Sequence, residues 1–284
     1  MLFRWRLRRN WATAWHAEEV TSRDTFTKSR PGAPKGFFSA EAAGLAWLAE
    51  PNAVPVVRVV DVGPDQLLLE RLEEGAPDED AARAFGRGLA RLHDSGAPAF
   101  GWSPADSAWF GPLQAPFSVP TRSHERFGTF WAQDRLKPLI AQLAPQLRPA
   151  QLELLRAATS TIQDGAFDEI AGGARENPAR VHGDLWSGNL MWVRQADGTA
   201  RGTLIDPAAH GGHRLEDLAM LHLFGAPHLA EIEAGYHDVH PLPAAWREDI
   251  PTHQLFGLLA HVHLFGTSYV APTLRAAEAV LARA

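Results

Sequence analysis

The sequence predicts an α+β protein of two lobes, a small N-terminal lobe with an antiparallel sheet and a larger, mainly helical C-terminal lobe. Before residue 30, apolar and polar side chains alternate in stretches, which is the period of half-exposed strands. From Asp78 onward, apolar side chains recur at helical spacing. The 284 residues can bury a sizeable core. We place the boundary near residue 74, with 1–73 forming the N-terminal lobe and 74–284 the C-terminal lobe.

Composition excludes several classes of protein. The formal net charge of −6 gives no basic surplus for binding nucleic acid. Cysteine is absent, which excludes disulfides and is compatible with a reducing cytoplasm. No apolar run approaches the ~20 residues of a membrane span. The charged N-terminus is not followed by the apolar segment of a signal peptide. We therefore expect a cytoplasmic protein without nucleic-acid or membrane partners.

The N-terminal lobe is expected to be mostly strands. Residues 2–9 and 12–20 alternate, and a turn leads from them to a further strand at 25–28. An apolar, β-branched stretch at 54–60 and another at 66–70 predict two more strands. Together these segments predict a small antiparallel sheet.

A helix is predicted at 38–49, between these strands. Glu41 shares one face of this helix with the apolar residues Phe38 and Leu48, so its carboxylate should point inward. A buried carboxylate without a partner is costly. Lys28 is the nearest cation carried by a strand, and we expect it to pair with Glu41.

The C-terminal lobe is expected to be helical around one long irregular segment. Amphipathic helices are predicted at 82–92, 124–144 and 149–164, and most of the chain after Leu218 is also expected to be helical. Residues 97–123 form a loop rich in Pro, Gly and aromatic residues. Loops of this length in compact domains are usually functional.

Polar groups with distinct chemistry interrupt the apolar segment 181–192. They are His182, Asp184, Ser187 and Asn189. A further apolar run, beginning at Thr203, ends in the carboxylate of Asp206. A carboxylate, an amide and a carboxylate at a strand end are the groups needed to hold Mg²⁺ and direct a nucleophile at a phosphate.

The spacing His182-x-Asp184-Leu-x-x-x-Asn189 matches the catalytic-loop signature of protein kinases, with Gly183 in place of Arg. In such a site Asp184 would accept the proton of the acceptor hydroxyl, while Asn189 and Asp206 would bind Mg²⁺. We therefore predict a small-molecule kinase with a protein-kinase-like fold that uses ATP and Mg²⁺. No glycine-rich phosphate-binding motif occurs in the chain.

Two further features of kinases have candidates here. A strand lysine paired with a helix glutamate fixes the lysine that grips the α- and β-phosphates, and Lys28 with Glu41 would take that role. Residues 69–73 would form the hinge between the lobes, so Glu70 and Leu72 are expected to contact the adenine through backbone groups.

The sequence resembles the fructosamine kinase (ketosamine-3-kinase) family. The segment from His182 to Asn189, HGDLWSGN, is the most specific signature of that family. Segments 204–208, 211–214 and 217–220 continue the pattern in the same order. The similarity runs from about residue 10 to 270, nearly the whole chain.

This resemblance implies the fold shared by aminoglycoside phosphotransferases and protein kinases. It also implies ATP-dependent phosphorylation of a sugar hydroxyl on a ketoamine, in the repair of glycated amines. The acceptor would be a small-molecule or protein-bound ketoamine, and a monomer is favoured. Candidate substrate residues are Trp186, whose ring is expected to face the sugar, together with His182 and Asp217. The position of His182 in the loop favours a supporting role over contact with substrate, with its side chain packed behind the loop.

The chain departs from the family pattern at two places. Residues 9–11 are Arg-Asn-Trp where the family has a pair of glycines in its nucleotide loop. Leu215 stands directly after Arg214, where the family has Glu, and Glu216 follows one place later. A shift of one residue turns a side chain by about 100° on a helix.

Two other functions are compatible with the sequence. A related kinase could phosphorylate another hydroxylated amine, such as an aminoglycoside or a choline-like acceptor. A nucleotide-binding pseudokinase would explain the missing glycines. The presence of Asp184, Asn189 and Asp206 together argues against a pseudokinase.

Overall fold

A computed structural model describes residues 24–284. The strands expected at 2–9 and 12–20, and the departure at 9–11, lie outside these residues. Within the described part, no helix has both the length and the hydrophobicity needed to cross a bilayer.

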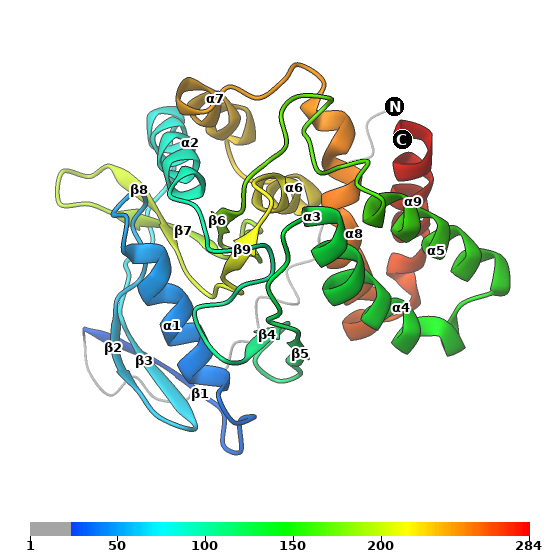
Figure 1. The fold of residues 1–284 in the computed structure, drawn as a ribbon. Coiled ribbons are helices and arrows are strands. Elements are labelled where there is room, and N and C mark those ends of the chain that lie inside the picture. The colour runs from blue at the N-terminus through cyan, green and yellow to red at the C-terminus, as the bar shows by residue number, and fades with distance from the viewer. Residues whose placement is uncertain (1–23) are drawn as a thin grey trace.

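The N-terminal sheet has three antiparallel strands in the order β1-β3-β2. These strands are β1 (Thr25–Ser29), β2 (Val59–Val62) and β3 (Gln66–Glu70), and the helix α1 (Phe37–Ala49) lies beside them (Figure 1). Phe38 and Leu45 of α1 are buried with Leu67 of β3 in one apolar cluster. The fold is α+β and protein-kinase-like, as the sequence predicts. The boundary near residue 74 stays a prediction.

The strand expected at 54–60 is largely wrong. Val54 and Val57 are buried, but within residues 54–58 the only β-type pairing is a single parallel bridge from Val56 to Leu204. Pro55 has no backbone N–H, and its carbonyl accepts a hydrogen bond from the Leu204 N–H. The apolar, β-branched pattern here reflects burial, of Val54 in the main core cluster and of Val57 in the cluster of α1 and the sheet, and antiparallel pairing begins only at Val59.

The C-terminal part is mainly helical, and several of its helices lie on the far side of the molecule from the sheet (Figure 1). Its helices are α2 (Glu79–Asp94), α3 (Phe127–Phe130), α4 (Lys137–Leu143), α5 (Pro149–Gln163), α6 (Leu215–Phe224), α7 (Leu229–Val239), α8 (Ile250–Phe265) and α9 (Val270–Arg283). Its strands form three antiparallel pairs: β4 (Ala108–Phe110) with β5 (Phe117–Val119), β6 (Ala179–Val181) with β9 (His210–Gly212), and β7 (Leu190–Arg194) with β8 (Ala200–Leu204).

The single helix expected at 124–144 is interrupted. A π-helical turn at Trp131–Leu136 separates α3 from α4, and the Lys137 N–H donates to the carbonyl of Ala132. Pro138 has no N–H to continue the α-helical ladder, which accounts for the break. Arg135 of this turn is buried, and its guanidinium donates to the carbonyl of Pro120 at 3.0 Å.

The loop expected at 97–123 contains the β4–β5 hairpin. Trp109 of the hairpin packs on Phe37 of α1, with ring centroids 6.2 Å apart. Phe110 packs on Phe256 of α8 at 4.8 Å. Because Trp109 and Phe110 are consecutive in β4, the hairpin contacts α1 with one face and α8 with the other. Its residues line the cavity described next.

Candidate active site

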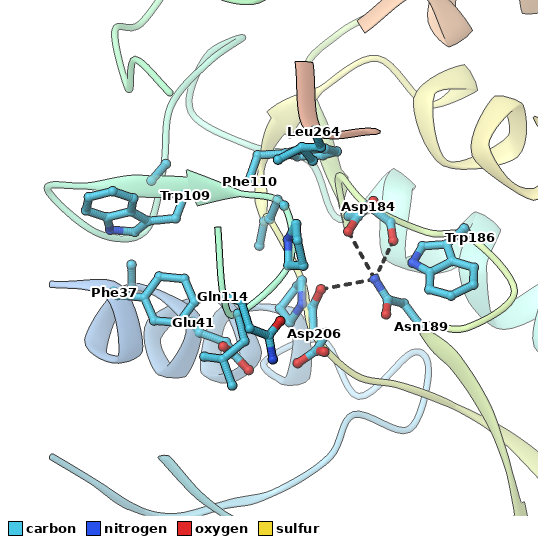
Figure 2. A pocket seen from close by; sticks show the side chains of 18 of the residues that line it. Phe37, Glu41, Trp109, Phe110, Gln114, Asp184, Trp186, Asn189, Asp206 and Leu264 are labelled. Atoms are coloured by element: carbon cyan, nitrogen blue, oxygen red, sulfur yellow. Dashed lines mark hydrogen bonds between the residues drawn. The ribbon is translucent and has the colours of Figure 1, made fainter. Parts of the chain in front are cut away.

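The predicted catalytic residues line one cavity of about 470 Å³ between α1, the β4–β5 hairpin and the segment that joins β6 to β9. The charged or amide side chains from the predicted set that face it are Lys28, Glu41, Asp184, Asn189 and Asp206. We call this group the polar end of the cavity. Figure 2 shows Glu41 on one side, Asp184 and Asn189 on the other, and Asp206 between them.

One amide connects three residues of the polar end. The Asn189 Nδ2 donates to the backbone carbonyl of Asp184 at 2.8 Å and to its carboxylate at 3.2 Å. It also donates to the backbone carbonyl of Asp206 at 3.3 Å (Figure 2). Since the β7–β8 hairpin joins Asn189 to Asp206, strand pairing brings the two ends of that hairpin together.

Lys28 carries the positive charge of the polar end. Its ammonium group donates to Glu41 at 2.8 Å and to Asp206 at 2.5 Å, and its side chain is only 9% exposed. The pair of Lys28 with Glu41 is thus present as the helical face of Glu41 predicts. Because β1, α1 and the segment after β8 each supply one of the three groups, this network joins the sheet lobe to the catalytic segment.

The cavity shifts the acidities of these groups in opposite directions. Burial raises the pKa of Asp184 well above its ordinary value, and the Asp206 carboxylate adds to the effect. Burial also raises the pKa of Glu41, to about 8, although Lys28 opposes the shift. Burial alone would raise the pKa of Asp206, but the adjacent Lys28 ammonium outweighs it and lowers that pKa. The polar end therefore favours additional positive charge near Asp184.

Two backbone conformations are unusual at this site. Asp206 has a φ of 53°, in the left-handed region that non-glycine residues rarely adopt. Gly183 has a φ of 82°, and a Cβ there would lie 2.4 Å from the carbonyl oxygen of Ala208. This position needs glycine, which explains why the Arg of the protein kinase signature does not stand here.

His182 and Asp217, two candidate substrate residues, lie behind the catalytic loop and not in the cavity. Both are fully buried. The Asp217 carboxylate accepts hydrogen bonds from the backbone N–H groups of His182 and Gly183 at 2.8 and 2.9 Å, and it contacts the His93 Nε2 at 3.1 Å. The His182 ring is hydrogen-bonded to the carbonyl of Ile205 at 2.8 Å. Both residues hold the loop in shape, and we do not propose that they touch substrate.

The expected hinge residues do not line the cavity. The Glu70 carboxylate accepts from the Arg58 N–H at 2.9 Å, so its side chain faces the residue that precedes β2. Leu72 is partly buried against the apolar cluster of the sheet lobe. Contact of their backbone groups with adenine stays a prediction.

Trp186 lines the cavity two residues beyond Asp184. Its ring lies over Gly188, where a Cβ would come within 2.1 Å of the ring. It also packs edge-on against Phe224 of α6, with centroids 6.1 Å apart. Glycine at 188 therefore gives Trp186 the space to lie beside the catalytic loop.

Glu216, displaced by one place from the family pattern, stabilises the start of α6. Its carboxylate accepts from the His213 N–H at 2.6 Å and contacts the His210 Nε2 at 3.0 Å. Leu215 is fully buried in the main core cluster. Neither residue lines the cavity.

Sequence reasoning missed the part of the cavity farthest along the chain from the catalytic motif. Its members are aromatic rings from α6, from α8 and from the turn that follows α8, namely Phe224, His261, Phe265 and Tyr269. We call these four residues with Trp186 the aromatic end. An amphipathic helix pattern marks such residues as core, so the sequence does not predict that they line the cavity.

The polar end suits Mg²⁺. Within the described residues, the Asn189 side chain makes its hydrogen bonds through Nδ2, which leaves its Oδ1 as a neutral oxygen ligand beside the Asp206 carboxylate. Among the described residues, no cluster of three or more His, Asp or Glu side chains has the arrangement of a metal cage. A magnesium site with few protein ligands is typical where water and phosphate oxygens complete the coordination.

Comparisons with known proteins agree with this fold and identify the family. The sequence profile described as fructosamine kinase matches residues 10–283. A probable ketoamine kinase from Enterococcus faecium is 32% identical over 249 residues, which cover 86% of this chain and 83% of that protein. The crystal structure of a candidate fructosamine-3-kinase from Thermobifida fusca matches with a TM-score of 0.79 and 39% identity, covering 91% of this chain and 85% of that one.

A more distant structure matches in fold alone. Choline kinase LicA from Streptococcus pneumoniae is 15% identical, with a TM-score of 0.57 over 93% of this chain and 88% of that one. The fold and the arrangement of the cavity define a phosphotransferase of the protein-kinase-like class. The chain belongs to the fructosamine kinase family, whose profile spans nearly its whole length.

Proposed function

We propose that this protein is an ATP-dependent ketoamine kinase, which transfers the γ-phosphate of ATP to a sugar hydroxyl of a fructosamine- or ribulosamine-type ketoamine. The observation that carries the proposal is the convergence of Asp184, Asn189 and Asp206 on one cavity with the Lys28–Glu41 pair. Phosphoryl transfer requires positioning and neutralisation of charge more than covalent chemistry. These five residues supply both.

Each residue of the polar end has a separate task. Asp184 accepts the proton of the acceptor hydroxyl as the hydroxyl oxygen bonds to the γ-phosphorus and the bond to the β-phosphate oxygen breaks. Lys28, held by Glu41, binds the α- and β-phosphates. Asn189 and Asp206 would hold Mg²⁺, which when bound neutralises phosphate charge and offsets the repulsion between the two carboxylates.

The acceptor reaches Asp184 from the side of the cavity opposite Lys28. Trp186 is proposed to present its ring to the sugar, because it follows the base by two residues and lines the same cavity. A ketoamine in small-molecule or protein-bound form would place its sugar between the Trp186 ring and the Asp184 carboxylate.

The proposal is tested by ATP turnover with fructosyl- and ribosyl-amines, beside an aminoglycoside and a choline control. We expect turnover with the ketoamines. Asp184→Asn should still bind Mg-ATP but lose at least ~10²-fold in kcat, the range for a lost general base. Turnover of this variant near the wild-type rate would exclude Asp184 as the base, and phosphorylation of only the control acceptors would refute the ketoamine assignment.

A further inference from the structure

The aromatic end forms one continuous wall of the cavity. Phe224, Phe265 and Tyr269 all pack around His261, with ring centroids 4.9, 5.3 and 5.0 Å from the His261 ring. Trp186 joins this wall through Phe224. Since Trp186 follows Asp184 by two residues, the wall begins beside the proposed base and extends away from it.

This wall carries no charge. The acidic and basic side chains that line the cavity, Lys28, Glu41, Asp184 and Asp206, all belong to the polar end. The imidazole of His261 is hydrogen-bonded through Nδ1 to the carbonyl of Gly257 at 2.6 Å, and burial lowers its pKa. A charged group placed against the wall would lose hydration without gaining an ionic partner among the described residues.

The wall also has apolar surface still to bury. Phe265 is the last residue of α8 and is 56% exposed, the largest exposure among the large apolar side chains that stand exposed in the described part of the chain. Gly266, with a φ of 87°, ends the helix directly after it. Because Phe265 lines the cavity, a ligand that extends past Trp186 would cover this ring and gain from removing its surface from water.

The cavity extends beyond the space that the transferred phosphate and a sugar occupy at the polar end, because the aromatic end also lines it. Its total volume of about 470 Å³ lies in the range of sites that enclose drug-sized ligands. With the reacting hydroxyl at Asp184, the part of a ketoamine that extends past Trp186 along the wall is the substituent on its amine nitrogen. Phe224, Phe265 and Tyr269 are tilted by 42°, 47° and 50° to the His261 ring, so together they offer aromatic surface against which a planar group can pack.

We propose that the aromatic end binds the substituent on the amine nitrogen of the acceptor, and that the preferred substituent is an uncharged aromatic group. This inference rests on the ketoamine kinase function and specifies its substrate class. The enzyme would then act best on ketoamines formed from small aromatic amines, and less well on those that carry a charged side chain.

The first experiment compares kcat/KM for four fructosyl derivatives that differ only in the amine: benzylamine, lysine, β-alanine and 2-aminoethyl-trimethylammonium. We expect the benzylamine derivative to exceed each charged one by about tenfold, the scale of one well-formed aromatic contact. Equal kcat/KM values, or preference for any charged derivative, would overturn the inference while leaving the ketoamine kinase function intact. Failure to phosphorylate any of the four would overturn both.

The second experiment assigns the preference to the wall. Phe265→Ala and Tyr269→Ala should each bring the ratio of benzylamine to lysine derivative close to one, whereas Tyr269→Phe, which retains the ring, should keep it. Leu281→Ala is the matched control, because Leu281 is an exposed apolar residue of α9 that does not line the cavity. An unchanged ratio in both alanine variants, or a ratio lost equally in the control, would contradict the assignment.

Discussion

The two ends of the cavity are held together by different forces. At the polar end, Lys28 and Asn189 link side chains and backbone groups through hydrogen bonds of 2.5–3.3 Å, so each group has one position that satisfies its partners. At the aromatic end, rings contact one another at 4.9–6.1 Å without hydrogen bonds between their side chains in the described structure. Hydrogen bonds fix direction, whereas ring contacts mainly fix area and shape.

This difference separates two tasks. A transferred phosphoryl group requires atoms placed to within a fraction of an ångström, which a directional network provides. Selection among acceptors requires a surface of suitable shape and polarity, which substitution of single rings can alter without disturbing the network. We therefore expect changes at the polar end to reduce kcat, and changes at the aromatic end to alter KM for the acceptor.

The largest effect is expected at Lys28. Lys28→Met removes the ammonium that contacts Glu41 and Asp206, and we expect kcat to fall by about 10²–10³-fold, as when a preorganised electrostatic donor is lost. Steady-state kinetics with ATP and a ketoamine will measure this. The conservative control is Lys28→Arg, which keeps the charge. A kcat for Lys28→Met within threefold of wild type, roughly 0.6 kcal/mol, would show that Lys28 does not take part in the transfer.

A smaller effect is expected at Trp186, where the two ends meet. Trp186→Ala should raise KM for the ketoamine by about tenfold through loss of ring contacts, with a much smaller change in KM for ATP. Varying each substrate separately provides the measurement. Equal increases in the two KM values would refute the role of Trp186 in binding the sugar.

The smallest effect is expected on stability, and it concerns His253, a residue that does not line the cavity. His253 is buried and stacks on His213 at 4.4 Å and on Phe127 at 5.0 Å, and within residues 24–284 its Nδ1 has no hydrogen-bond partner. Burial lowers the pKa of His253 to about 3. As pH falls below 6.5, the imidazole therefore takes up a proton in the unfolded chain before it does so in the folded protein, which favours unfolding. The contribution of His253 to the free energy of unfolding is therefore fully present well above pH 6.5 and is lost progressively as pH falls from 6.5 to about 3.

The matched variant is His253→Phe, which keeps the stacking and cannot titrate. Between pH 6.5 and 5.5, urea unfolding should show the wild type losing about 1 kcal/mol more than this variant. Parallel pH dependences of the two proteins would show that His253 is not the titrating group. Because His253 does not line the cavity, the ratio of acceptor preferences at neutral pH should be unchanged in this variant.

Sequence alone predicted the polar end well because its residues carry recognisable chemistry at fixed spacing. The positions of Asp184 and Asn189 follow from one short motif, and the inward face of Glu41 follows from helical periodicity. The cavity-lining rings of α8 could not be found in this way, since aromatic residues in an apolar helix indicate a core as readily as a pocket. His182 and Asp217 show the same limit in reverse, because a polar residue within a motif can support the loop without facing the ligand.

The errors in the fold have a similar origin. The segment 54–60 is buried but pairs only through one bridge, so its β-branched composition predicted burial correctly and strand pairing incorrectly. The helix at 124–144 kept its apolar face while Pro138 forced a π-helical turn into it. Periodicity records which side of an element is buried. The backbone hydrogen bonds depend on other things: on a distant partner, Leu204, for the segment 54–58, and on the nearby Pro138 for the helix.

The amide of Asn189 has one chemical consequence beyond catalysis. Its two hydrogens are shared among three oxygen atoms. The site therefore requires an amide nitrogen at a position where a carboxylate oxygen would fit equally well by shape. Deamidation would convert this group into a carboxylate of the same size and turn three attractions into three repulsions. Chemical ageing at this single atom would therefore separate Asp184 from Asp206 without any change in the volume of the side chain.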